Sequence, residues 1–184
     1  VEKKLKTCFI IVVLLASISG VLGIFVLLFT NNSYSRALVK NGFSQGEIGR
    51  FTTYINKEAL LVRELLLQDD KETIQELDLV TEDTDAAFAR LKINCNTEEE
   101  KRLIQIIDEY LPQYRTVRQE IVDAADQNHG DDSLEILNST AKPLMNKVVE
   151  ASDALMTLNE EMGNSAQKRL TYQTYIILTV MLVI

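Results

Sequence analysis

The chain has 184 residues, which is room for about one ordinary domain. It is 46% hydrophobic and 25% charged, with seven glycines, two prolines and no tryptophan. This composition disfavours a β-sandwich, a collagen-like chain and a low-complexity disordered chain. Residues 31–169 hold 16 Lys and Arg against 26 Asp and Glu, a net charge of −10, so we expect no nucleic-acid partner.

The first 30 residues predict a membrane span. Lys6 and Arg36 bracket 29 consecutive uncharged residues, and the 22 residues from Cys8 to Phe29 have the length that a helix needs to cross a bilayer. A cleaved signal peptide is the alternative, but its apolar region would be only about 7 to 15 residues long. The three lysines at the start place the N-terminus inside the cell. We predict a cytoplasmic N-terminus at residues 1–6 and an uncleaved transmembrane helix at residues 7–30.

A second apolar run begins near Tyr172 and continues to Ile184. It is too short to span a membrane, so we expect a second transmembrane helix that is cut through its middle. Tyr172 and Tyr175 have the character of interfacial aromatics. This predicts an extracytoplasmic segment at residues 31–169, the start of a truncated span at residues 170–184, and a cytoplasmic continuation that is missing. The expected location is the plasma membrane, with a multi-pass topology.

Four heptad seams follow one another in the exterior segment, where apolar side chains recur at alternating steps of three and four. The connections are short, so neighbouring helices are antiparallel. We predict an all-α, antiparallel up-down-up-down four-helix bundle, anchored in a membrane, whose first and fourth helices are continuous with transmembrane helices. The seams are Ile48, Phe51, Ile55, Ala59, Val62 and Leu66; Ile74, Leu77, Thr81, Thr84, Phe88, Leu91 and Cys95; Leu103, Ile107, Tyr110, Tyr114, Val117, Ile121 and Ala124; and Leu137, Ala141, Leu144, Val148, Ala151, Leu155, Leu158 and Met162.

Local signals divide the seams in the same way. A capping side chain three residues before a carboxylate satisfies free amides at a helix start, and it occurs three times, as Asp69 with Glu72, Thr97 with Glu100 and Asp132 with Glu135. The prolines, Pro112 and Pro143, fall inside seams that continue on both sides. We expect a kink or a local break at each.

A stripe of small residues lies beside the core seam of the first exterior helix. Gly42, Gly46 and Gly49 fall at i, i+4 and i+7, and Thr53 extends the stripe. One interpretation is local weakness of the helix or an irregular entry loop, because glycine lowers helix stability by about 1 kcal/mol relative to alanine. The other is close contact between the first helices of two subunits in a homodimer. Both interpretations stay open.

The same face carries a candidate ligand site. Arg63 lies on the extended stripe with Asn56, near the far end of the first exterior helix, and a guanidinium could pair with a ligand carboxylate through two hydrogen bonds. A surface ion pair with a nearby acid is the alternative role for Arg63. Asn138 and Lys142, early in the fourth helix, lie opposite in an antiparallel bundle and are weaker candidates.

No catalytic or metal-binding pattern is present in the sequence. His129 stands alone, and there is no metal-spaced set of Cys and His, no phosphate loop and no nucleophile elbow. We therefore expect no enzyme activity, no metal and no cofactor. Cys8 and Cys95 are too far apart in the topology to pair, so Cys95 is expected to be a partly buried free thiol, or else to bridge two subunits.

The order of these features resembles the four-helix-bundle sensor of methyl-accepting chemotaxis proteins, and most closely the chemoreceptors of clostridia. The resemblance covers essentially the whole chain. It rests on the basic N-terminus and membrane anchor, the phrases Tyr34-Ser35, Gly42-Phe43-Ser44-Gln45-Gly46-Glu47-Ile48-Gly49 and Arg63-Glu64-Leu65-Leu66-Leu67, the heptad helix with Tyr110 and Tyr114, and the second anchor.

The resemblance implies an N-terminal fragment of a homodimeric transmembrane receptor. Its ligand, an amino acid, an organic acid or a binding protein, would sit near the membrane-distal end between subunits. The fourth helix would relay a small displacement to a cytoplasmic signalling part that contacts a kinase and adaptors. The family's aspartate-binding members use several arginines on the first helix, and only Arg63 matches here. The alternatives are a sensor module of a histidine kinase or cyclase, and a membrane-anchored coiled-coil scaffold without a ligand.

Overall fold

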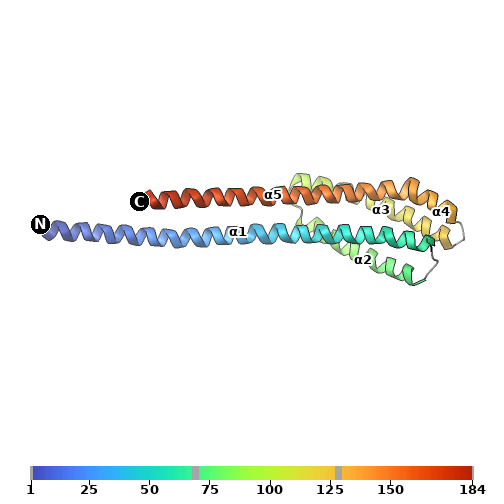
Figure 1. Cartoon of the computed structure of the whole chain (residues 1–184), viewed down its shortest axis with the longest axis horizontal. Coiled ribbons are helices and arrows are strands. Elements are labelled where there is room, and N and C mark those ends of the chain that lie inside the picture. The colour runs from blue at the N-terminus through green and yellow to red at the C-terminus, as the bar shows by residue number, and fades with distance from the viewer. Residues whose placement is uncertain (1, 68–70, 127–129, 184) are drawn as a thin grey trace. The chain divides into compact units, whose positions relative to one another are not determined.

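The computed structural model describes residues 2–67, 71–126 and 130–183, and their side chains except at 36–41, 71, 125, 126, 130–132 and 180–183. Its elements in chain order are α1 (Glu2–Leu67), α2 (Lys71–Asn94), α3 (Glu98–Asp126), α4 (Gly130–Ile136), the π-helical turn η1 (Leu137–Ala141) and α5 (Lys142–Val183) (Figure 1). No strand occurs in the described residues. The predicted all-α class is confirmed.

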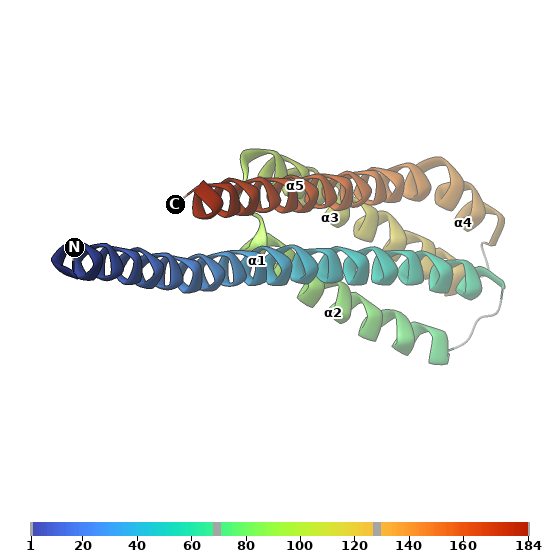
Figure 2. The same ribbon diagram turned by 60° about the vertical axis from the view of Figure 1, so that its left-hand side comes forward.

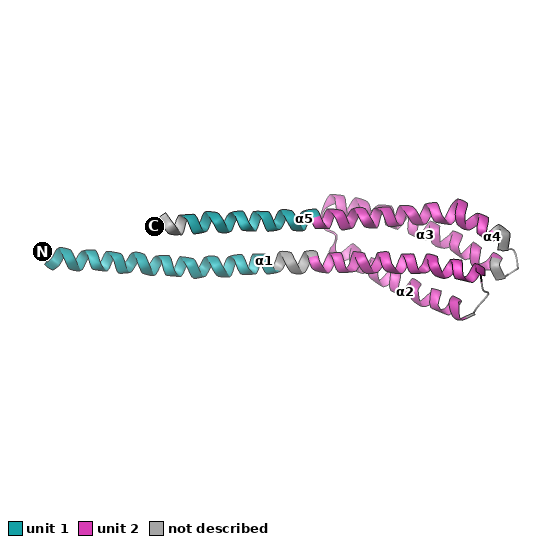
Figure 3. Cartoon of the chain, in the orientation of Figure 1, with its two compact units in different colours: residues 1–41, 161–184 teal, residues 42–160 magenta. Residues whose placement is uncertain are grey.

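The chain forms two compact units, drawn in different colours in Figure 3. One contains residues 42–160, and the other contains residues 1–41 together with residues 161–184. Both α1 and α5 contribute to each unit, since neither helix is interrupted where the units meet. The predicted continuity of the first bundle helix with an apolar N-terminal helix is therefore confirmed, whereas a membrane span at the end of α5 stays a prediction.

The unit of residues 42–160 is an antiparallel four-helix bundle. The second part of α1, then α2, α3 and the contiguous α4, η1 and first part of α5 lie side by side in both views (Figures 1 and 2). The predicted seams supply its core, since most of their members are buried and the rest are partly buried. Phe51 and Phe88 join α1 to α2 with ring centroids 5.4 Å apart. Each fully buried aliphatic or aromatic side chain contributes roughly 1.5–3 kcal/mol, so apolar burial dominates the stability of the bundle.

The turn between α2 and α3 is closed by the predicted capping box. The backbone N–H of Glu100 donates to Thr97 Oγ1 at 3.2 Å, and Glu100 Oε2 accepts from the N–H groups of Thr97 at 2.8 Å and Asn96 at 2.9 Å. These bonds satisfy amides that a helix start leaves free. The cap predicted at Asp132 is wrong, because α4 already begins at Gly130 and Asp132 lies inside it. Asp69 lies outside the described residues.

The two prolines have different effects. Helix α3 continues through Pro112 without a break. Pro143 lies two residues after the end of η1, where the N–H of Lys142 donates to the carbonyl of Leu137, five residues back. A proline ring clashes with the carbonyl four residues before it, here that of Ser139, and the wider π turn relieves that crowding. The local break expected at Pro143 is thus confirmed as a single π turn.

The other unit contains the apolar part of α1. The stretch Glu2–Ser35 is long and apolar enough to span a membrane, with a mean hydropathy of 2.9 in its most apolar window and none of that window buried. Among the described residues it is the one stretch that meets these criteria. The second span at residues 170–184 stays a prediction.

Candidate functional site

The four predicted ligand residues are exposed, three of them near one end of the bundle and Asn56 about two turns farther along α1. Arg63 and Asn56 lie on α1, Asn138 lies in η1, and Lys142 begins α5. The end of α1 and the α4–η1 segment meet at the same end of the bundle (Figures 1 and 2). Both asparagine side chains turn back to their own helices, since Asn56 Nδ2 donates to the Thr52 carbonyl at 2.8 Å and Asn138 Nδ2 to the Leu134 carbonyl at 2.9 Å. A ligand role for these residues stays a prediction.

The glycine stripe is not required by packing inside the bundle. Gly42 and Gly46 are exposed, and a Cβ added at either would meet nothing within 4 Å. A Cβ at Gly49 would lie 3.9 Å from Cε of Met156, which is an ordinary contact. Thr53 is exposed and its hydroxyl donates to the Gly49 carbonyl at 2.8 Å. Helix-to-helix crowding within this chain therefore gives no reason for glycine at these three positions.

A group of charged and polar side chains extends from the bundle interior to the exposed Asp85, and we call it the core ion cluster. Glu58 of α1 has no exposed surface, and its Oε2 accepts from Nη1 of Arg118 of α3 at 2.6 Å. The same Nη1 donates to Thr81 Oγ1 of α2 at 2.9 Å. Arg115 donates to Asp85 Oδ1 at 2.6 Å, and its Nη2 lies 3.5 Å from Glu58 Oε1. The cluster therefore ties three helices together and consists of Glu58, Thr81, Asp85, Tyr114, Arg115 and Arg118.

The cluster is not fully satisfied by its own members. The Tyr114 hydroxyl, Glu58 Oε1, Arg118 Nε and the Nε and Nη2 atoms of Arg115 are buried without a hydrogen-bond partner in the described part of the chain. Burial raises the pKa of Tyr114 well above its ordinary value, and the charge of Glu58 raises it further, while Arg118, Arg115 and Arg63 act in the opposite direction. Each unsatisfied buried group lowers stability by about 1–3 kcal/mol. The unsatisfied polar groups thus lower the stability of the bundle where α1 meets α3.

Two more polar contacts connect α1 to its neighbours. Glu47, whose side chain is 3% exposed, accepts from Nε of Arg90 of α2 at 2.6 Å and from Arg50 of its own helix at 3.1 Å. Thr52 Oγ1 lies 2.7 Å from Oγ of Ser152 of α5, and Ser152 is fully buried. With the core ion cluster, these contacts give α1 a directional polar bond to α2, α3 and α5. Such bonds fix the register between helices more sharply than apolar packing does.

The sequence analysis missed the core ion cluster, although a signal for it was present. Glu58 lies three residues after Ile55 and four before Val62, which puts it on the buried face of α1. Arg118 lies four residues after Tyr114 and three before Ile121, on the buried face of α3. An acid and a base on facing buried surfaces indicate an ion pair, because a lone buried charge is costly.

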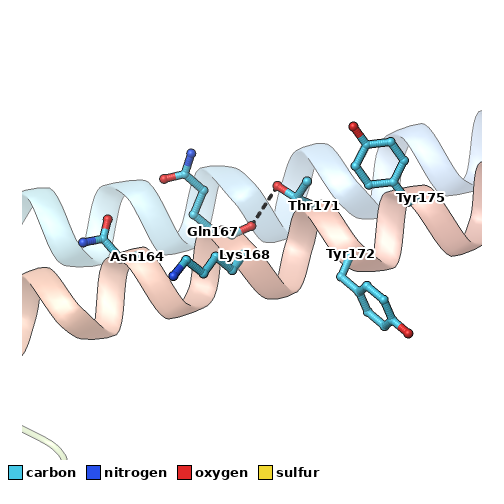
Figure 4. A pocket seen from close by; sticks show the side chains of 6 residues that line it. All are labelled: Asn164, Gln167, Lys168, Thr171, Tyr172 and Tyr175. Atoms are coloured by element: carbon cyan, nitrogen blue, oxygen red, sulfur yellow. Dashed lines mark hydrogen bonds between the residues drawn. The ribbon is translucent and has the colours of Figure 1, made fainter.

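A hollow of about 530 Å³ lies on the surface of α5 in the unit of residues 1–41 and 161–184. Figure 4 shows that its lining comes from this one helix, and that the Thr171 hydroxyl donates to the Gln167 carbonyl at 3.0 Å. Tyr172 and Tyr175 are about two-thirds exposed, at 68% and 66%. Exposed tyrosines beside a lysine are more typical of a membrane-interface belt than of a ligand pocket. The lining residues are Asn164, Gln167, Lys168, Thr171, Tyr172 and Tyr175.

Comparison with known proteins identifies the family of this bundle. A family model described as a four helix bundle sensory module for signal transduction matches residues 1–173. A search of curated proteins gave no match. The family match covers both units and confirms the resemblance to the sensors of chemoreceptors.

Proposed function

Because the chain belongs to the family of four-helix-bundle sensory modules for signal transduction, we propose that it is the ligand-sensing part of a transmembrane chemoreceptor. In this proposal the bundle lies outside the cytoplasm, binds a small molecule or a binding protein, and relays that event across the membrane. The receiving partners, a kinase and its adaptors, would be reached through a cytoplasmic part that follows this segment.

The continuity of α1 is the observation that carries this proposal. Residues 2–35 of α1 are apolar enough to span a membrane, and residues 48–65 of the same helix form a buried face of the bundle. An unbroken hydrogen-bonded helix carries a shift along its axis with little loss, whereas a flexible loop would absorb it. A displacement of α1 in the bundle would therefore reach the membrane segment.

The polar contacts of α1 give such a displacement a small number of preferred positions. The register of α1 is set by the hydrogen bond that Arg118 donates to Glu58 and by the one between the hydroxyl groups of Thr52 and Ser152. Moving α1 along its axis requires these bonds to break or to exchange partners, so intermediate positions are disfavoured. Unsatisfied donors on Arg115 and Arg118 and the free hydroxyl of Tyr114 offer alternative partners for Glu58. A ligand would need only a modest difference in affinity between two positions to shift the population.

The proposed ligand site lies at the end of the bundle that holds Arg63 on α1, with Asn56 about two turns farther along the same helix. Asn138 and Lys142 lie at the same end on the fourth helix, and all four side chains are exposed. Two cationic groups and two amides suit a ligand with a carboxylate, such as an amino acid or an organic acid. The proposed homodimer brings the stripe of Gly42, Gly46, Gly49 and Thr53 on α1 against the same stripe of a second copy.

The test is a thermal-shift screen of the full chain in lipid nanodiscs against amino acids and organic acids. A ligand that binds the folded state raises the melting temperature in a saturable way. We expect Arg63→Ala to abolish that shift while the melting temperature without ligand stays within a few degrees of the parent. Arg102→Ala is the matched control, because Arg102 is an exposed arginine of α3, with 72% of its side chain accessible.

Two results would count against the proposal. If no compound in the screen produces a shift, direct sensing of these ligand classes is wrong for this chain. An equal ligand shift in Arg63→Ala and the parent would leave sensing intact and remove Arg63 from the site.

A further inference from the structure

The solvent-facing side of α2 carries a second heptad seam. Its members recur at alternating steps of four and three, and positions with that spacing form one stripe along a helix. The stripe lies opposite the buried face that contains Val80, Thr84 and Leu91. We call it the outer seam of α2, and all its members are exposed: Gln75, Leu79, Glu82, Ala86, Ala89 and Ile93.

The apolar members of the outer seam are unusual for this bundle. Leu79 is 63% exposed and Ile93 is 79% exposed. Single exposed apolar residues are normal on protein surfaces, but here two large ones and two alanines share one stripe. On α3, and on α5 as far as residue 160, no large hydrophobic side chain among those described is exposed. Phe43, Leu60 and Leu67 of α1 and Leu134 of α4 are exposed as well, and of these Leu60 and Leu67 lie on the face assigned above to the dimer.

Acidic side chains border the outer seam on both flanks. Some of them pair with neighbouring helices, as Glu76 does with Lys57 at 2.6 Å and Asp85 with Arg115 at 2.6 Å. Asp78 and Asp83 are exposed on opposite flanks, and Glu82 is exposed within the seam. In the described part of the chain, none of these three carboxylates has a cationic group within salt-bridge distance. The seam therefore combines four apolar members with exposed carboxylates that are available to an outside partner, because the cations Arg90 and Lys92 of the same helix are already paired with Glu47 and Asp108.

We propose that the outer seam of α2 is a docking surface for a separate protein that presents an amphipathic helix with an apolar seam and basic flanks. The heptad spacing suits another helix, since ridges of one helix pack into the grooves of the next. The stripe from Gln75 to Ile93 is about 27 Å long at a rise of 1.5 Å per residue, which suits a partner helix of about five turns. The flanking carboxylates select lysine and arginine on that partner.

Charge decides between the possible occupants of this surface. A second copy of α2 would bring carboxylates against carboxylates, and the whole chain carries a net charge of −8. Like charges across an interface are unfavourable, so the seam does not suit self-association. An anionic lipid surface is disfavoured for the same reason. A basic helix is the partner whose field complements this one.

The experiment uses the full chain in nanodiscs of zwitterionic lipid and a fluorescent synthetic helix as the probe. The probe has about three heptads, with leucine at the a and d positions and lysine at e and g. We expect saturable binding by fluorescence anisotropy, which weakens as salt rises. Leu79→Ser with Ile93→Ser, and separately Glu82→Gln with Asp83→Asn, should each weaken binding by about tenfold or more. Leu134→Ser is the matched control, because Leu134 is 46% exposed on α4, and it should leave binding unchanged.

Several outcomes would overturn the proposal. Absence of binding would do so, as would equal binding of a peptide with the same composition and a shuffled heptad, which would indicate charge attraction alone. Equal binding by the Leu79→Ser, Ile93→Ser variant would place the contact elsewhere. If that variant instead changes the chain from dimer to monomer in analytical ultracentrifugation, the outer seam belongs to a second copy. Because these exposed positions lie away from Arg63 and the glycine stripe, failure here would leave the ligand-sensing proposal standing.

Discussion

At the scale of single residues, the pairing of Glu58 with Arg118 is the most demanding feature of the bundle. The Glu58 side chain has no exposed surface, and the Arg118 side chain is 9% exposed. Removing one charge from water costs several kcal/mol, and the attraction between the two charges offsets that cost only while both are present. The net stability of the pair is therefore small, although each partner depends strongly on the other.

Removing one partner of this pair should destabilise the bundle severely. We expect Glu58→Ala to lower the free energy of unfolding by about 3–5 kcal/mol, because Arg118 is then buried without a countercharge. The combined variant Glu58→Leu with Arg118→Met should recover most of this loss, since it removes both charges at similar volume. Denaturant unfolding of the full chain in detergent, followed by circular dichroism, measures both.

The control for that prediction is a charge on the surface. Lys57→Ala breaks an ion pair with Glu76 in which both side chains are nearly half exposed, and it should change stability by about 1 kcal/mol or less. If Glu58→Ala were no worse than Lys57→Ala, the core ion cluster would not be desolvated as the structure shows.

Cys95 provides a residue-scale prediction with a pH dependence. Burial, and then the charge of Glu100, raises the pKa of the Cys95 thiol from 9.0 to about 11. In a Cys8→Ser background, the reaction of Cys95 with a thiol reagent at pH 8 should be about 100-fold slower in the folded chain than in denaturant, because only the thiolate reacts. The folded-state rate should keep rising about tenfold per pH unit until the pH approaches 11.

The raised pKa of Cys95 also determines how the stability of the fold changes with pH. The folded state holds the thiol proton more tightly than the unfolded state, so the contribution is complete below pH 9 and is lost as the pH rises from 9 to about 11. Tyr114 also makes the fold less stable as the pH rises above its ordinary pKa of 10.0, because burial keeps its hydroxyl protonated in the folded state. A melting temperature that rises between pH 9 and 11 would contradict both assignments.

At the scale of elements, the capping box at the start of α3 makes a measurable contribution to stability. Thr97→Ala removes the acceptor for the Glu100 N–H and should lower the free energy of unfolding by about 1 kcal/mol. Thr97→Ser keeps the hydroxyl and should restore most of that stability. Thr116→Ala is a suitable comparison, since Thr116 is partway along α3 and its hydroxyl donates to the carbonyl of Pro112 in its own helix. Equal losses in Thr97→Ala and Thr116→Ala would show that the cap adds nothing.

The elements were largely predictable from the sequence because the seams follow a simple period. Burial of one face of each helix requires apolar residues every three to four positions, and the sequence shows this pattern directly. The π turn of η1 was not predictable in detail, since a proline inside a helix can be accommodated by a kink, a break or a wider turn. Pro112 and Pro143 show the difference, because α3 continues through one while a π turn precedes the other.

The candidate site was less predictable than the fold. Exposed residues such as Arg63 and Asn138 carry no apolar periodic signal, because solvated positions tolerate many side chains. Only side-chain chemistry, position on a helical stripe and the antiparallel topology point to them. The core ion cluster depends on which faces of α1 and α3 meet, and that pairing is a tertiary property that no local pattern specifies. Glu58 and Arg118 come together across 60 positions of sequence.

At the scale of the whole molecule, substitutions in the glycine stripe of α1 have different effects in a monomer and in a dimer. A Cβ at position 46 would meet nothing within 4 Å inside this chain. In a monomeric bundle, Gly46→Ala should therefore raise the free energy of unfolding by about 0.5–1 kcal/mol, since alanine favours a helix more than glycine does. In a dimer whose α1 helices touch along this stripe, the added methyl groups would push the helices apart and weaken association.

Sedimentation equilibrium of the full chain in density-matched detergent distinguishes the two cases. For the proposed dimer we expect the dissociation constant of Gly46→Ala to rise by about tenfold, equivalent to about 1.4 kcal/mol of association free energy. Ala154→Ser on α5 is the control, because Ala154 is exposed on a helix face outside the proposed dimer contact, and it should leave association unchanged. A parent chain that is monomeric at all concentrations, with a stabilised Gly46→Ala variant, would assign the stripe to local helix weakness instead. The relay across the membrane would then depend on α1 and α5 of a single chain.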